Sequence, residues 1–141
     1  MQEKKIFKPK LDKLYFLILI PAAALILTLT LISAIEAPLT LSFMLPVCLF
    51  VLYFFISSLF GYVELREETL FIKFGFILKK EIPYSEIRGM KKERKPYSES
   101  MISLKNAMEH VNVRYNKFDT VTVSVIDNDE LIDNLSARIQ K

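Results

Sequence analysis

The chain has 141 residues, of which 52% are hydrophobic, and it carries a formal net charge of +3. Residues 14–60 contain a single charged side chain, Glu36, whereas the segment 61–141 holds 14 basic and 13 acidic residues. So balanced a segment excludes the concentrated basic face of an electrostatic nucleic-acid binder, and we expect no nucleic-acid partner. The only cysteine, Cys48, cannot form an intrachain disulfide and has no metal-ligating neighbours, so no metal and no cofactor are expected.

Residues 1–13 form a basic N-terminal stretch, and two uncharged apolar runs follow it, at 14–35 and 39–60. A helix of 22 residues is roughly 33 Å long at ~1.5 Å per residue, enough to cross a hydrocarbon core of ~30 Å. The first run is longer than the ~7–15 residues of a signal-peptide core, which favours a transmembrane helix. Only residues 36–38 separate the runs, so we predict an antiparallel transmembrane hairpin.

The distribution of lysine and arginine predicts the orientation of this hairpin. Five lysines precede the first run, none lies between the runs, and further basic residues follow the second run. Basic residues accumulate on the cytoplasmic side of membrane helices. We therefore expect a multi-pass protein of the cell membrane with both termini in the cytoplasm. Neither run contains Asp, Glu, Lys, Arg or His, which argues against a proton relay or ion pathway.

From residue 61 onwards the hydrophobic pattern changes to the period of two that is typical of strands. Asp127 is a suitable N-cap for a final helix, and Glu130 lies at the capping-box position. An apolar stripe follows at helical spacing, at Leu131, Ile132, Leu135 and Ile139. We predict a small α+β domain at 61–141, a curled antiparallel sheet or barrel of about seven strands capped by a C-terminal helix. The strongest strand predictions are 62–66, 70–74, 77–82, 110–115 and 120–125, and the weaker ones are 87–92 and 101–104.

Two motifs and the C-terminal segment resemble a known family. The motifs are Leu70-x-Ile72-x-x-Gly75 and Ile82-Pro83-Tyr84-x-x-Ile87, and the segment is 121–135. They resemble bacterial pleckstrin-homology-like (PH-like) domains, although Val125 stands where that pattern usually has proline. The resemblance implies a binding or assembly module without a known catalytic centre, and members often carry one or two N-terminal membrane helices.

Few residues of the predicted domain suggest a site. His110 is the only histidine, and the strand alternation predicts that it points to solvent. Members of the wider PH superfamily that bind phosphoinositides use basic residues around the first hairpin, but here that turn, residues 66–69, is acidic. A short basic run is the candidate contact for anionic lipid, with ordinary solvated charge as the alternative. The run consists of Lys91, Lys92, Arg94 and Lys95.

No polar constellation in the sequence indicates an enzyme. We therefore expect a non-catalytic, membrane-anchored PH-like interaction or scaffold module on the cytoplasmic face. Its expected partners are the lipid bilayer and another protein. The alternative is a small membrane immunity or stress-protection protein that acts against a toxic peptide, and a bacteriocin gene cluster nearby would favour that alternative.

Overall fold

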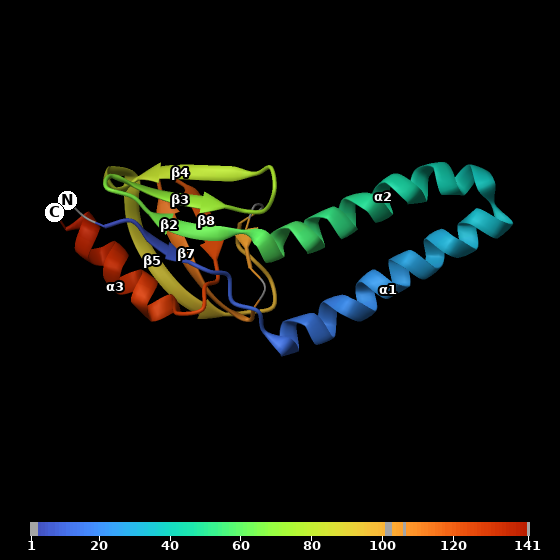
Figure 1. Cartoon of the computed structure of the whole chain (residues 1–141), viewed down its shortest axis with the longest axis horizontal. Coiled ribbons are helices and arrows are strands. Elements are labelled where there is room, and N and C mark those ends of the chain that lie inside the picture. The colour runs from blue at the N-terminus through green and yellow to red at the C-terminus, as the bar shows by residue number, and fades with distance from the viewer. Residues whose placement is uncertain (1–2, 101–102, 106, 141) are drawn as a thin grey trace.

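The computed structural model describes residues 3–100, 103–105 and 107–140. Two helices extend as a hairpin from one side of a β-rich domain (Figure 1). Helix α1 spans Lys13–Glu36 and α2 spans Pro38–Ser57, continued by the 3-10 turn η1 at Ser58–Phe60. Both helices are long and apolar enough to cross a membrane, and only 6% of the most apolar window of either is buried. That exposure distinguishes them from the core helices of a soluble protein.

Local chemistry explains where the helices begin and turn. The Asp12 carboxylate caps α1 by accepting a hydrogen bond from the Leu14 backbone N–H at 3.1 Å. Pro38 is the first residue of α2, where its missing N–H costs no hydrogen bond. Thr30, Cys48 and Ser57 are the buried side chains of the described part of the hairpin.

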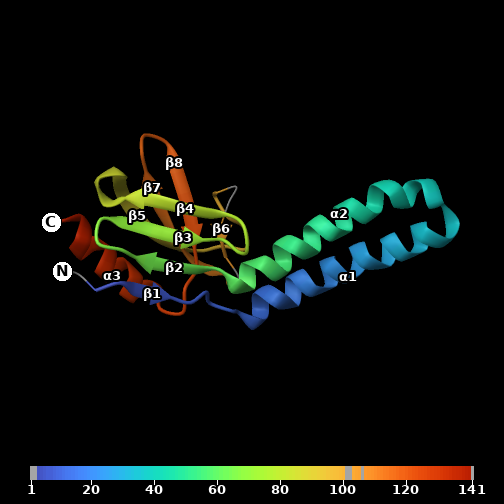
Figure 2. The ribbon, with the colours of Figure 1, turned by 45° about the horizontal axis from the view of Figure 1, so that its top comes forward.

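The domain consists of two four-stranded sheets, and Figure 2 shows them crossing at an angle. The first has the order β1-β2-β3-β4 and the second the order β5-β7-β8-β6. Neighbouring strands are antiparallel except for the parallel pair β6–β8. The strands are β1 (Lys5–Phe7), β2 (Tyr62–Leu65), β3 (Thr69–Lys73), β4 (Lys79–Pro83), β5 (Ile87–Arg94), β6 (Ser103–Leu104), β7 (Glu109–Tyr115) and β8 (Asp119–Val123). The predicted fold class is confirmed, with the qualification that the sheets do not close into a barrel.

Helix α3 (Asn128–Ile139) covers one open end of the sheets (Figure 1). Asp127 caps it as predicted, because its carboxylate accepts a hydrogen bond from the Glu130 N–H at 2.9 Å. The Glu130 carboxylate instead contacts the ammonium of Lys5. Leu131 and Leu135 are 1% and 0% exposed, so the apolar stripe packs into the core between the sheets. The other large side chains of this core are Phe7, Leu65, Leu70, Ile72, Phe74, Ile82, Tyr84, Ile87, Leu104 and Tyr115.

The N-terminal stretch takes part in this domain, which its sequence pattern did not predict. Strand β1 pairs with β2, and the Phe7 side chain is only 6% exposed. Backbone hydrogen bonds continue beyond the strand, from the Ile126 N–H to the Lys8 carbonyl and from the Lys10 N–H to the Ser124 carbonyl, both at 3.1 Å. Residues on both sides of the hairpin therefore build one sheet. The division of the chain into an N-terminal stretch (1–13), a transmembrane hairpin (14–60) and a C-terminal domain (61–141) stays a prediction.

The strand bounds differ from the predicted ones by one or two residues. The predicted strand 77–82 begins at Lys79, because residues 75–78 form the turn that joins β3 to β4. The weak prediction at 101–104 corresponds to β6 at Ser103–Leu104, and residues 101–102 lie outside the described part of the chain. The 3-10 turn η2 (Tyr84–Glu86) then leads the chain from the first sheet into β5.

Candidate functional site: the cleft between the sheets

The basic run occupies the end of β5, where the strand alternation separates its members. Lys91 and Lys95 flank Glu93 on one face, with ammonium–carboxylate distances of 2.6 and 2.8 Å. The hydrogen bond from Lys91, and to a smaller extent the one from Lys95, lowers the pKa of Glu93 to about 2. Lys95 also reaches Glu99 at 3.1 Å. Much of the positive charge of this face is therefore balanced within the domain.

The opposite face of β5 looks towards the C-terminal helix. Lys92 forms an ion pair with Asp129 in the first turn of α3, at 2.7 Å, and this hydrogen bond raises the pKa of Lys92. Arg94 is exposed, and no hydrogen bond or ion pair of its guanidinium is found among the described residues. The structure therefore does not gather the four cations into one patch. Their contact with anionic lipid stays a prediction, and Arg94 is its strongest member.

His110 does not point to solvent, and that prediction was wrong. Its side chain is 0% exposed, because the chain between β5 and β7 folds over the outer face of the second sheet. Lys105 in that segment donates hydrogen bonds from its ammonium to the backbone carbonyls of Lys95 and Tyr97. The imidazole Nδ1 lies 3.0 Å from the Met108 carbonyl, and Nε2 is buried without a partner. Burial lowers the pKa of His110.

The acidic turn between β2 and β3 lies at the end of the domain opposite the helical hairpin (Figures 1 and 2). Arg66 is held there by Glu64 at 3.2 Å and Glu81 at 3.1 Å, and its guanidinium stacks 4.1 Å from the centre of the Phe71 ring. The hydrogen bond that Thr69 donates to Glu81 lowers the pKa of this carboxyl group, and the hydrogen bond from Arg66 lowers it further. Glu67 and Glu68 keep the turn acidic, and it points away from the helices. The expectation against phosphoinositide recognition at this hairpin stays a prediction.

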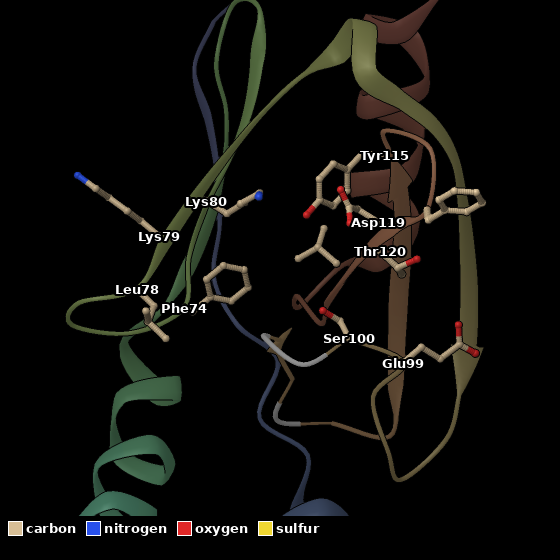
Figure 3. Close-up of a pocket in the computed structure, with 11 residues that line it drawn as sticks. Phe74, Leu78, Lys79, Lys80, Glu99, Ser100, Tyr115, Asp119 and Thr120 are labelled. Carbon is tan, nitrogen blue, oxygen red and sulfur yellow. The ribbon is translucent and has the colours of Figure 1, made fainter.

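A cleft of 340 Å³ lies between the two sheets. We call it the inter-sheet cleft, and Figure 3 shows Phe74 and Lys80 of one wall and Tyr115 of the other directed into it. Phe74, Leu78, Lys79 and Lys80 line one side, Tyr115, Phe118, Asp119, Thr120 and Val121 the other, and Glu99 and Ser100 the rim.

Strand topology creates the inter-sheet cleft. Strand β4 is the last strand of the first sheet and has no hydrogen-bonded neighbour on its outer side among the described strands. Lys80 lies on the inward-facing side of β4, as Ile82 does, and Figure 3 shows it directed towards Tyr115. Its ammonium is 5.1 Å from the centre of the Tyr115 ring. Lys80 therefore occupies an inward-facing position of an edge strand where an apolar residue would be usual. A charged residue at such a position discourages non-specific pairing of the strand with other chains.

The inter-sheet cleft combines apolar and charged side chains. Its apolar residues Phe74, Leu78 and Val121 lie beside the charged Lys80 and Asp119. No group of three or more metal-ligating side chains occurs in the described part of the chain. A free strand edge next to an apolar recess is the arrangement by which sheets accept an additional extended segment.

Sequence reasoning did not find this cleft. The available signal was the pair Lys79 and Lys80 in the middle of the predicted strand 77–82, since lysines are typical of edge strands. The residues of the opposite wall are some 35 to 50 positions further along the sequence, so only the tertiary structure brings the two walls together.

The comparison with protein-family models agrees with this architecture. Residues 61–139 match the model of the bacterial PH domain. The match covers β2 to α3, that is, both sheets apart from β1, and their closing helix. Searches for similar curated proteins and for similar solved structures each found no match. The match spans more than half of the chain, and the protein therefore belongs to the bacterial PH domain family.

Proposed function

We propose that this protein is a non-catalytic interaction module, anchored in the cell membrane by α1 and α2, with its PH domain at the cytoplasmic face. The length, apolar composition and exposure of the two helices support the anchoring. The lysines before α1 and the basic residues after α2 support the orientation. The membrane then confines the domain to two dimensions, so that even a weak partner interaction at its surface becomes effective.

The partner is another protein, and it docks an extended segment in the inter-sheet cleft. The observation that carries this proposal is the unpaired edge of β4 beside the apolar recess of Phe74 and Leu78. Backbone groups of β4 would supply affinity, and the recess would select an apolar side chain. Lys80 would favour a segment with an acidic residue or a carbonyl group close to that side chain, because its ammonium has only the Tyr115 ring opposite it.

Labelling of single cysteines in intact cells tests the anchoring and orientation. Cys48→Ala removes the only native cysteine, and Ala37→Cys then places a thiol in the turn between the helices. A membrane-impermeant maleimide should label this thiol from outside the cell. The matched variant Asp133→Cys, on the exposed face of α3, should be labelled only after lysis. Labelling of Asp133→Cys in intact cells would overturn the proposed orientation.

Photo-crosslinking from the inter-sheet cleft tests the partner. A photoreactive amino acid in place of Thr120, which lines the cleft, should give a discrete adduct in cells. The same amino acid in place of the exposed Asp133 serves as the control and should not give it. Adding Lys80→Glu should remove the adduct from the Thr120 variant, because it reverses the charge at the cleft mouth. Equal adducts at both positions, or an adduct that Lys80→Glu leaves unchanged, would contradict binding in the cleft.

A further inference from the structure

The turn between β3 and β4 carries three consecutive large apolar side chains that the protein does not cover. Phe76, Ile77 and Leu78 are 52%, 74% and 37% exposed. Turns between strands are usually built from small and polar residues. A contiguous exposed apolar cluster in a soluble surface marks a binding site for a protein or a membrane.

This turn lies against the end of α2, as Figures 1 and 2 both show. The Phe76 ring centre is 5.2 Å from that of Phe60 and 6.4 Å from that of Tyr53. Gly75 sits directly on Ser57, where an added Cβ would come within 2.5 Å of the Ser57 Oγ atom. A glycine is therefore needed for the turn to approach the helix this closely, and the aromatic contacts hold it in place.

The length of α2 sets the depth that the turn reaches. Its 20 residues measure roughly 30 Å, which matches a hydrocarbon core of ~30 Å with nothing to spare. Tyr53 precedes the last residue of α2 by four positions and so lies about 6 Å inside the end of the helix. A helix that spans the core places Tyr53 below the membrane surface. The Phe76 ring contacts both Tyr53 and Phe60, the last residue of η1, so it lies at the end of the helix where the core meets the headgroups.

Charged residues frame the apolar turn. Lys73 and Lys79 are directly opposite each other in the β3–β4 register, and the turn lies between them. Figure 3 shows the Lys79 side chain directed away from the inter-sheet cleft. Lysines that flank an apolar segment match the anionic headgroups above the hydrocarbon of the cytoplasmic leaflet. A second protein would not account for the continuity of this surface with the apolar side of α2.

We propose that the β3–β4 turn, residues Gly75–Leu78, is a third membrane contact that inserts Phe76 and Ile77 into the cytoplasmic leaflet beside α2. The proposal rests on the membrane anchoring proposed above. The turn fixes the tilt of the PH domain relative to the membrane, because the ends of α1 and α2 and the turn provide three points of contact with the lipid. The inter-sheet cleft, which shares Leu78 with the turn, is then held open at the membrane surface.

Single tryptophans test this insertion cleanly because the chain contains none. The full chain is reconstituted in lipid nanodiscs with Ile77→Trp, and Phe76→Trp serves as a conservative second variant. Their emission should shift to shorter wavelength, and lipids that carry a spin label high on the acyl chain should quench it. Phe118→Trp is the matched control, since Phe118 is an 87% exposed aromatic in the β7–β8 turn, and it should emit as in water without quenching.

A fourth variant, Leu49→Trp in the middle of α2, separates the two proposals. If Leu49→Trp is not quenched by lipids labelled deep in the acyl chain, the helices do not span the bilayer and the anchoring fails. If Leu49→Trp is quenched while both turn variants behave like Phe118→Trp, the anchoring stands and the turn does not insert. Quenching of the turn variants and of Leu49→Trp, with none of Phe118→Trp, is the expected result.

Discussion

Strand β1 allows a direct test of whether the N-terminal stretch is part of the folded domain, because its successive side chains point to opposite faces of the sheet. Phe7 is 6% exposed in the core, whereas Ile6 is 62% exposed on the outer face. Replacing a buried phenylalanine by alanine costs about 3–5 kcal/mol, and we expect the lower end for Phe7→Ala because β1 is an edge strand. Ile6→Ala, the matched control, should change the stability by less than about 0.5 kcal/mol, as for other surface substitutions.

Urea-dependent proteolysis of the full chain in mild detergent measures this difference, because the helices remain protected while the domain unfolds. A loss of about 3 kcal/mol, divided by a urea dependence of about 1–1.5 kcal/mol/M for a small domain, lowers the midpoint by about 2–3 M. Ile6→Ala should leave the midpoint almost unchanged. Equal midpoints for the two variants would show that the N-terminal stretch is not part of the folded domain.

Three further predictions concern the rest of the domain. Leu135→Asp should unfold it, because an unpaired carboxylate would replace a side chain that is 0% exposed; a melt like that of the native chain would refute this. His110 titrates below its unfolded-state pKa of about 6.5, so the unfolded state binds more protons in that range and stability should fall as the pH drops below about 6.5; His110→Gln should remove this part of the pH dependence. Salt-sensitive binding of the protein to anionic vesicles should be lost when glutamine replaces the basic run, and Arg94→Gln alone should account for more of that loss than Lys92→Gln; equal binding to neutral vesicles would refute the lipid contact. The run is Lys91, Lys92, Arg94 and Lys95.

The sequence by itself determined the elements whose signal is local. An uncharged apolar run predicts a helix and its length, and the structure places α1 and α2 within a few residues of the predicted ends. Period-two alternation predicts the strands, and Asp127 with the stripe of Leu131 and Leu135 predicts α3. These predictions succeed because backbone geometry fixes which side chains share a face.

Only the tertiary structure decided what covers each face. Strand β1 has three residues, too few for a periodic signal, and it forms because β2 offers it a free edge. His110 alternates as an outward-facing residue should, yet a segment between two strands folds over it. Lys92 meets Asp129 from 37 positions away, and this ion pair removes much of the free charge that the basic run suggested.

The inter-sheet cleft and the apolar surface of the β3–β4 turn have the same origin. Each depends on segments that are distant in sequence and become neighbours when the two sheets pack and the β3–β4 turn docks on α2. The hydrophobic pattern predicts which face of a helix or strand is buried, but it does not predict which other element packs against that face. That choice is made by the packing of the whole chain, because burial is favourable with any partner of suitable shape.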